Sequence, residues 1–279
     1  MENVAIELKD VSYAYPDGHV ALQRVNLKVV RGERIAILGA NGAGKSTLLM
    51  LMNGLYAPST GTVSVLGNPA TGRYLSTVRR EVGLVFQDPD DQLFCPTLWD
   101  DVCFGPLNMG LSEEEVRIRS VEALRAMGLE GYEDKLPHHL SAGEKKKAAI
   151  ATVLAMHPKI LILDEPTANL DPKGRLELTN LLRELYENHD LTLIIATHDV
   201  NFVPAVADRA CVLNGGRLVA DGPLREVFSN RSVMEEANLE PPIVTQVYRA
   251  LAKDNGNNTK RFPLTVEEAL SELGCYSQE

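Results

Sequence analysis

Apolar positions along this chain follow the patterns of strands first and of helices later. Near the N-terminus every second residue is apolar in two segments, which predicts two strands with one buried face each: Val4, Ile6 and Leu8, then Val25, Leu27 and Val29. Tyr13 and Tyr15 close the first strand. Three later runs are almost wholly apolar: residues 34–38 (RIAIL), 159–164 (KILILD) and 191–197 (LTLIIAT). Such runs are typical of central strands in a parallel sheet covered on both faces.

Helical patterns occupy much of the middle and the end of the chain. Ser112 with Glu115 resembles a capping box and predicts a helix that stops at Gly128, and a second helix should begin at Ser141. After residue 230 the chain is more polar. A helix there carries one apolar stripe (Ile243, Val247, Tyr248 and Leu251), and Thr265 with Glu268 predicts the cap of a last short helix. We interpret residues 1–229 as one domain with a helical insert at about 88–157, and residues 230–279 as a small helical appendage.

The run GANGAGKST, from Gly39 to Thr47, indicates a phosphate-binding loop. Its glycines, Gly39, Gly42 and Gly44, allow positive φ and close backbone approach, so that N–H groups at a helix start can point at the β-phosphate. Lys45 then reaches the β- and γ-phosphates, and Ser46 offers a hydroxyl to Mg²⁺. A buried strand precedes the loop and a helical pattern follows it. The loop predicts a nucleotide ligand, but kinases, GTPases, helicases and transport ATPases all use it.

Size, charge and cysteine content narrow the range of functions. The 279 residues are 44% hydrophobic and 24% charged, and no apolar run approaches the ~18 residues that span a bilayer. The N-terminus lacks the features of a signal peptide, so we expect a cytosolic protein that meets the membrane only through a partner. A net charge of −10 argues against a nucleic-acid surface. The cysteines form no CxxC pair and are expected to be reduced thiols: Cys95, Cys103, Cys211 and Cys275.

Two carboxylates end the second apolar run, in the sequence ILILDEP. The carboxyl ends of strands in a doubly wound sheet face the ligand crevice. We therefore expect Asp164 to hold Mg²⁺ and Glu165 to orient and polarise the attacking water. The alternative is that both acids are ordinary turn residues at the end of a strand.

The segment LSAGEKKKAAIA, from Leu140 to Ala151, offers a second helix N-terminus that could bind phosphate. The Ser141 hydroxyl and the Gly143 amide are suited to donate to a γ-phosphate, and the helix dipole adds partial positive charge. An ordinary capped helix explains the same residues, because Ser141 with Glu144 also satisfies a capping box.

Together these motifs resemble the ATP-binding subunit of an ATP-binding cassette (ABC) transporter, over roughly Val4 to Phe228. The resemblance implies an α/β P-loop NTPase fold with a mixed core sheet, an N-terminal antiparallel β-subdomain and a helical subdomain. It implies ATP-binding roles for Tyr15, Gly39, Asn41, Gly42, Ala43, Gly44, Lys45, Ser46, Thr47, Ser141, Ala142 and Gly143. It implies Mg²⁺ contacts for Ser46, Gln87 and Asp164, and catalytic roles for Lys45, Gln87, Glu165 and His198. Tyr13 is an alternative to Tyr15 for stacking on adenine, and simple packing on the strand is an alternative for both. Ala142 stands where a second glycine is commoner in the family.

The same resemblance implies that ATP is shared between two copies of the chain. In this family two cassettes pack head to tail, so that the Ser141 helix of one completes the ATP site of the other. Residues 168–171 (ANLD) match the loop that connects the two sites. A membrane partner docks on the helical insert, between residues 88 and 137 here.

Three segments resemble the cobalt and nickel branch of the energy-coupling factor importers. Their sequences are VFQDPDDQLF around Gln87, FGPLNMGLS and PHHLSAGEKKKAAIA. That branch implies an ATPase homodimer beneath a transmembrane coupling protein, at the cytoplasmic face of the membrane, with a separate membrane component that selects the metal. Cobalt is favoured, while nickel and vitamin importers stay open. We interpret His138 and His139 as a structural turn. Rival functions are a soluble ABC ATPase acting on ribosomes or DNA, and a metabolic kinase.

Overall fold

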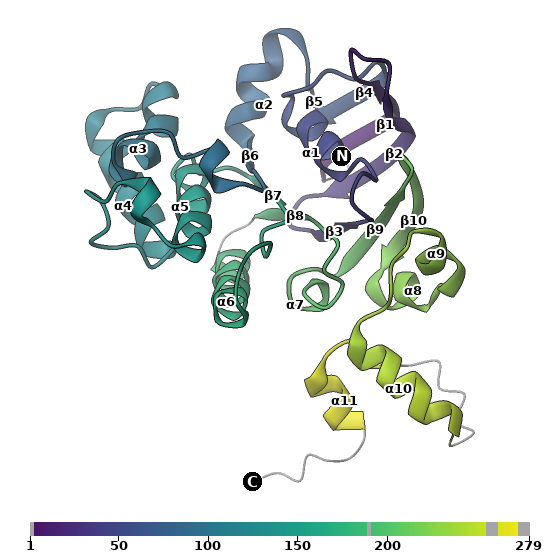
Figure 1. Ribbon diagram of the computed structural model, residues 1–279. Helices are drawn as coiled ribbons and strands as arrows, with labels where there is room; N and C mark the ends of the chain where they lie inside the picture. Colours follow the sequence, from purple (N-terminus) through teal and green to yellow (C-terminus); the bar gives the residue numbers. More distant parts are fainter. Residues whose placement is uncertain (1–2, 189–190, 255–261, 273–279) are drawn as a thin grey trace.

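The computed structural model describes residues 3–188, 191–254 and 262–272, and within these ranges the strands form an antiparallel sheet and a mixed sheet (Figure 1). The antiparallel sheet has the order β2-β1-β4-β5, with β1 at Val4–Ala14, β2 at Val20–Val30, β4 at Thr60–Val65 and β5 at Asn68–Pro69. Both N-terminal strands predicted from period-two alternation are present. Their inward residues are buried because only one face of this sheet packs on the core.

The mixed sheet has the order β10-β9-β3-β8-β7-β6. Its strands are β3 (Arg34–Leu38), β6 (Val82–Val85), β7 (Ile160–Asp164), β8 (Thr192–Thr197), β9 (Arg209–Asn214) and β10 (Arg217–Pro223). All neighbouring pairs are parallel except β9 with the edge strand β10. The three apolar runs are its inner strands β3, β7 and β8, as predicted. The edge pair β9 and β10 was not predicted from the sequence.

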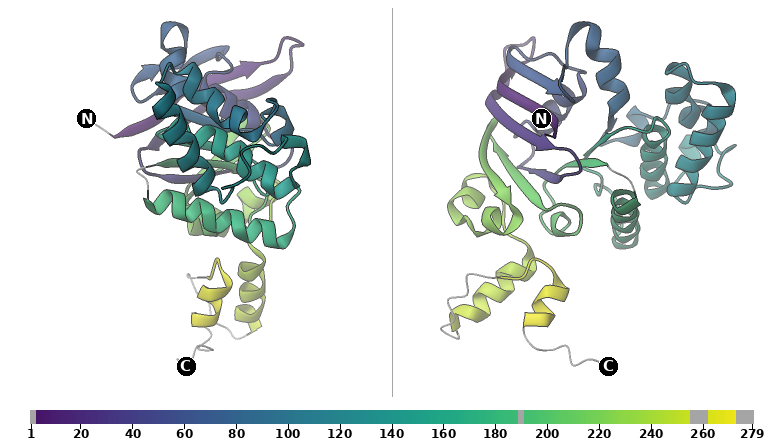
Figure 2. Two further views of the ribbon diagram at one scale, coloured as in Figure 1. Left: turned by 90° about the vertical axis from the view of Figure 1, so that its left-hand side faces the viewer. Right: turned by 180° about the vertical axis from the view of Figure 1, so that it is seen from behind.

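Helices cover the sheets and form a separate group on one side (Figures 1 and 2). Their bounds are α1 Lys45–Asn53, α2 Leu75–Glu81, α3 Leu98–Asn108, α4 Glu113–Ala126, α5 Ala142–Leu154, α6 Pro172–Asn188, α7 Val203–Val206, α8 Leu224–Ser229, α9 Arg231–Glu236, α10 Ile243–Asp254 and α11 Val266–Glu272, with short 3₁₀ turns η1 Gly72–Tyr74, η2 Pro89–Asp91 and η3 Pro137–His139. Helices α3, α4 and α5 pack on one another and make up the helical insert. No helix in the described ranges combines the length and the apolar character that crossing a bilayer requires.

The helix starts agree with the sequence, although the caps differ in detail. Ser141 caps α5 with the full reciprocal capping box. Ser112 accepts from the amide of Glu115, but the Glu115 carboxylate pairs with Arg119 at 2.6 Å instead of returning to the cap. The predicted box at Ser112 is therefore only half formed, because a guanidinium one turn along the helix competes for the carboxylate.

The C-terminal segment projects from the two sheets as α10 and α11 (Figure 2). Phe262 and Leu264 share a buried cluster with Phe228 of α8, which attaches this segment to the mixed sheet. The predicted apolar stripe lies on α10, but Ile243, Val247 and Leu251 are 57%, 53% and 49% exposed. The domain boundary near residue 230 stays a prediction.

The predicted thiols and the histidine pair have ordinary surroundings. Cys103 and Cys211 are buried, Cys95 is half-buried, and Cys275 lies outside the described residues. His138 and His139 lie in the turn η3, where their rings meet edge to face with their centroids 4.3 Å apart.

Candidate active site

The phosphate-binding loop connects β3 to α1, and its glycines serve two different purposes. Gly42 and Gly44 have φ of 80° and 102°, which a side chain would disfavour. Gly39 is not in this left-handed region. A Cβ at Gly39 would lie 2.4 Å from the carbonyl oxygen of Leu213, so glycine is needed there for close packing against β9. The loop leads directly into α1, whose first turn has no side-chain cap. The backbone N–H groups at the start of α1 are therefore available to an anion.

Lys45 is buried at the base of the loop, with 6% of its surface exposed. Its Nζ donates to the carbonyl oxygens of Gly39 at 2.8 Å and Ala40 at 3.3 Å. The same ammonium lies 3.2 Å from the Glu165 Oε1 atom. The loop and the end of β7 are therefore joined through one positive charge.

Asp164 is the last residue of β7 and has the features of a cation ligand. Its carboxylate is buried, and its Oδ1 has no hydrogen-bond partner in the described part of the chain. Burial raises the pKa of Asp164, although a hydrogen bond from Ser46 and the charge of Lys45 oppose that rise. A buried carboxylate oxygen without a partner, beside a serine hydroxyl, suits a hard cation such as Mg²⁺. The residues present fit the ion that the sequence predicts.

Glu165 follows immediately, with a φ of 43° that is unusual for a glutamate. Its Oε2 accepts from the Thr197 hydroxyl at 2.9 Å and from the His198 amide at 3.3 Å, and its Oε1 lies 2.9 Å from His198 Nδ1. Burial alone would raise the pKa of Glu165, but the hydrogen bonds from His198 and Thr197 and the charge of Lys45 leave it below its ordinary value. Glu165 is thus held as a carboxylate in a fixed position.

His198 follows β8 and approaches the cluster from the neighbouring strand. Its side chain is 55% exposed, in contrast to the buried Glu165. Because Nδ1 is engaged with Glu165, Nε2 is the ring nitrogen left to contact a phosphate. The parallel pairing of β3, β7 and β8 explains how Lys45, Glu165 and His198 meet, since these strands end at one edge of the sheet.

Tyr15 and Tyr13 differ in their surroundings. The Tyr15 hydroxyl lies 2.8 Å from Thr47 Oγ1 in the first turn of α1. Tyr13 stacks on Tyr56 with parallel rings whose centroids are 5.1 Å apart, and it packs against the main core. Tyr15 is therefore the aromatic ring hydrogen-bonded to the phosphate loop, while the contact of either ring with adenine stays a prediction.

Gln87 and the start of α5 are related to this cluster in different ways. Gln87 is exposed after β6, and within the described chain its side chain makes no hydrogen bond or ion pair with Asp164 or Glu165. Its backbone carbonyl is nevertheless close to the site, because it and the Glu165 carbonyl both accept from Lys146. Ser141, Ala142 and Gly143 begin α5 and line a separate cavity of about 590 Å³ with the loop 169–171. Figure 1 shows α5 and α1 in different parts of the molecule. Within the described chain, the cavity at the start of α5 does not include Lys45.

Comparison with known proteins identifies the family. The model of the ABC transporter family matches residues 22–168. The energy-coupling factor transporter ATP-binding protein EcfA of Methanocaldococcus jannaschii is 49% identical over 276 residues, which cover 98% of each chain. This chain belongs to the ABC transporter ATP-binding family. It is an ABC ATPase, and this family binds ATP with Mg²⁺, as predicted.

Solved structures of other ABC cassettes confirm the fold. The cbiO1 structure from Clostridium perfringens, part of the ABC transporter complex cbiONQ, is 44% identical with a TM-score of 0.75, over 85% of this chain and 95% of that one. A dimeric ATP-binding cassette bound to ADP and Pi after hydrolysis is 32% identical with a TM-score of 0.70, over 78% of this chain and 98% of that one. The α/β P-loop fold with a mixed core sheet is therefore confirmed.

The sequence did not single out Lys146, which this ABC ATPase buries beside the site. Its exposed fraction is 4%, and its Nζ donates to the carbonyl oxygens of Gln87 and Glu165. Burial lowers the pKa of this lysine. It thus ties the Ser141 helix to the loops after β6 and β7. Helical spacing could have predicted the burial of Lys146, because Lys146 lies four residues before Ile150 and so shares the apolar face of α5.

Proposed function

We propose that this chain is the ATP-hydrolysing subunit of an energy-coupling factor importer, and that the importer carries cobalt. The observation that carries the proposal is the 49% identity to an EcfA protein, which extends through the C-terminal segment as well as the ATPase core. The cobalt assignment is supported by the similarity to cbiO1 of the cbiONQ complex and by the amino-acid sequence around Gln87. Nickel and vitamin importers are the alternatives, because a separate membrane component selects the substrate.

The roles of the site residues follow from the cluster. Glu165 is the ionised carboxylate placed to orient and polarise the attacking water. Lys45 and His198, which both lie against the Glu165 Oε1 atom, contact the β- and γ-phosphates. Asp164 and Ser46, with Gln87, hold Mg²⁺, which neutralises phosphate charge when it is bound.

A second copy of the chain completes the site in this proposal. Within one chain, Ser141 and the loop 169–171 line a cavity that does not include Lys45. A head-to-tail dimer would place the start of α5 opposite the phosphate loop of the other copy. ATP would then favour the closed dimer, and its hydrolysis would remove that preference.

The partner surface in this proposal lies on the helical insert. Phe94 and Phe104 are 66% and 48% exposed and meet edge to face at 4.9 Å, and Leu107 on the same helix as Phe104 is 54% exposed. Exposed aromatic and aliphatic side chains grouped in this way mark interaction sites. A transmembrane coupling protein that grips them would hold this ATPase at the cytoplasmic face of the membrane.

Purification from native membranes tests the partner. We expect the wild-type chain to co-purify with membrane proteins, and Phe94→Asp with Phe104→Asp to lose them while keeping ATPase activity in isolation. Val30→Asp changes an exposed apolar residue on β2 and should keep the partner. Recovery of ribosomes or DNA in place of membrane proteins would favour the rival function.

Metal uptake by the purified complex in proteoliposomes tests the substrate. We expect ATP-dependent accumulation of Co²⁺ that stops when Glu165→Gln replaces the wild-type chain. Accumulation of Ni²⁺ without Co²⁺ would assign the chain to a nickel importer.

A further inference from the structure

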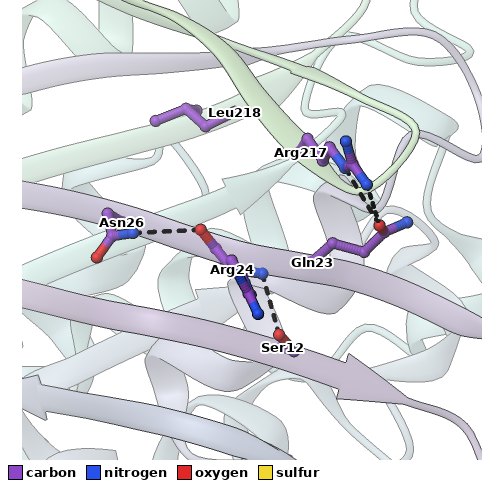
Figure 3. A pocket seen from close by; sticks show the side chains of 6 residues that line it. All are labelled: Ser12, Gln23, Arg24, Asn26, Arg217 and Leu218. Atoms are coloured by element: carbon purple, nitrogen blue, oxygen red, sulfur yellow. Dashed lines mark hydrogen bonds between the residues drawn. The ribbon is translucent and has the colours of Figure 1, made fainter.

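A cavity of about 640 Å³ lies where the antiparallel sheet meets the edge strand β10 (Figure 3). Its lining comes from β1, β2 and β10: Ser12, Gln23, Arg24, Asn26, Arg217 and Leu218. This lining contains two arginines and no acidic residue. None of these residues belongs to the proposed ATP site or the proposed partner surface.

A strained bulge places Arg24 at this cavity. Between the pairs Val11 with Val25 and Tyr13 with Leu22, β2 has one residue more than β1, so Gln23 and Arg24 oppose Ser12 alone. Arg24 has a φ of 48°, and both of its backbone polar groups are fixed: its amide donates to Ser12 Oγ at 3.0 Å and its carbonyl accepts from Asn26 Nδ2 at 3.2 Å. Such bulges redirect side chains, and strained residues cluster at binding sites.

Arg217 is oriented without being neutralised. Its Nε and Nη2 both donate to the Gln23 Oε1 atom, at 3.1 Å and 2.8 Å (Figure 3). In the described part of the chain neither Arg24 nor Arg217 makes an ion pair, whereas Arg209 on the neighbouring strand pairs with both Glu33 and Asp221. Both arginines are exposed, and within the described residues neither guanidinium has a carboxylate partner, in a chain of net charge −10.

The cavity wall also contacts the phosphate-binding loop. The amide of Gln23 donates to the Gly216 carbonyl at 2.8 Å, and the amide of Gly216 donates to the Ala43 carbonyl at 3.1 Å. A Cβ at Gly216 would lie 2.5 Å from the Ala21 carbonyl oxygen, so β2, the β9–β10 turn and the loop are closely packed. Gln23 is therefore connected to the phosphate-binding loop through two successive backbone hydrogen bonds.

We propose that this cavity binds a small anion bearing phosphate or carboxylate groups, held by Arg24 and Arg217, and that its occupancy changes the affinity of the adjacent loop for ATP. Guanidinium groups recognise both anion types through paired N–H donors. Coupling between the two sites is reciprocal, so ATP must change the anion affinity by the same factor. The inference goes beyond the proposed transport function and does not depend on the transported ion.

Calorimetric titration of inorganic phosphate and, separately, succinate tests the site. The protein is first saturated with Mg²⁺ and a non-hydrolysable ATP analogue, so that phosphate cannot enter the phosphate loop. We expect saturable binding of at least one probe, weakened about tenfold or more by Arg24→Gln and by Arg217→Gln. Arg117→Gln removes an exposed arginine of α4 and should leave binding unchanged. Preference for phosphate or for succinate identifies which anion class the cavity takes.

Two results would overturn the proposal. The first is absence of saturable binding for both probes, and the second is equal weakening by Arg117→Gln. The coupling is tested by the affinity of the ATP analogue with and without the bound probe, which should differ in the wild-type chain and not in Arg24→Gln. If the wild-type chain binds the ATP analogue with equal affinity in the presence and absence of the probe, the proposed coupling is wrong. Thermal unfolding midpoints establish that each variant is folded.

Discussion

Glu165 has a backbone conformation that glutamate rarely adopts, and its side-chain contacts account for it. Three neighbours fix the carboxylate: the Thr197 hydroxyl, the His198 ring and the Lys45 ammonium. These contacts offset the cost of a positive φ, which is of order 1–3 kcal/mol. Strain held in this way pre-organises a group for a chemical step. Glu165 is therefore the residue whose replacement should separate ATP binding from turnover.

We predict that Glu165→Gln binds ATP with nearly wild-type affinity and lowers the hydrolysis rate by about 100-fold or more, because the amide cannot accept a proton from water. Steady-state phosphate release and equilibrium binding of ATP are the two measurements. The variant should also accumulate as an ATP-bound dimer. Glu184→Gln changes an exposed glutamate on α6 and should leave both quantities unchanged. Unaltered hydrolysis in Glu165→Gln would remove this residue from the proposed role.

The lowered pKa of Glu165 has a consequence for acid stability. In the folded chain this carboxyl takes up a proton at lower pH than in the unfolded chain, so its contribution to the free energy of unfolding is complete above pH ~4.5. That contribution is lost as pH falls through the folded pKa. We predict that the stability difference between wild type and Glu165→Gln shrinks in this acidic range. Urea unfolding at pH 7 and at successively lower pH measures the difference, and a constant value would contradict the prediction.

Helix α10 shows that an apolar stripe in the sequence does not guarantee a buried one. Ile243, Val247 and Leu251 are about half exposed and, with residues of α11, line an apolar cavity of about 220 Å³. Contiguous exposed apolar surface of this kind marks an interaction site. We propose that the C-terminal segment contacts the second copy of the chain, which would cover the stripe.

We predict that Val247→Asp weakens dimer formation, because the dimer would bury an uncompensated charge. Analytical ultracentrifugation with and without a non-hydrolysable ATP analogue measures the dimer constant, which should weaken at least about tenfold. Val30→Asp alters a comparably exposed residue far from α10 in the sequence and serves as the control. If both variants dimerise as the wild type does, the stripe has another purpose.

At the scale of the whole molecule, the parts of the proposed ATP site lie in two separate places. The carboxyl edge of the mixed sheet gathers Lys45, Asp164, Glu165 and His198, while the start of α5 lies on the helical insert (Figure 1). If ATP needs both parts, a single chain has no complete site, and each site must combine one part from each of two copies.

Mixing two inactive variants tests this arrangement. Lys45→Ala damages the phosphate loop and Ser141→Arg damages the start of α5, so each alone should lack ATPase activity. In a head-to-tail dimer of the two, one site has both defects and the other has none. We predict that the mixture recovers up to about a quarter of the wild-type rate, because about half of randomly assorted dimers are mixed and each has one intact site. No recovery, with mixed dimers present, would contradict sharing between chains.

Local patterns determined the elements that the sequence predicted correctly. The glycine loop, the capped start at Ser141 and the apolar runs of β3, β7 and β8 are each specified by residues within a few positions of one another. Placing Lys45, Asp164, Glu165 and His198 together also followed from sequence, because strands of a parallel sheet end at a common edge. The individual roles of these residues stay predictions.

Contacts between distant segments were decided only by the tertiary structure. The stacking of Tyr13 on Tyr56, the burial of Lys146 and the exposure of the α10 stripe depend on which surfaces meet. The same is true of Gly39, which is required by the carbonyl of Leu213 and not by its own φ. The sequence by itself determined a nucleotide site and the elements that carry it, because those signals are local. The folded chain decided which side chains are buried, paired or left facing solvent, because burial is a property of packed surfaces.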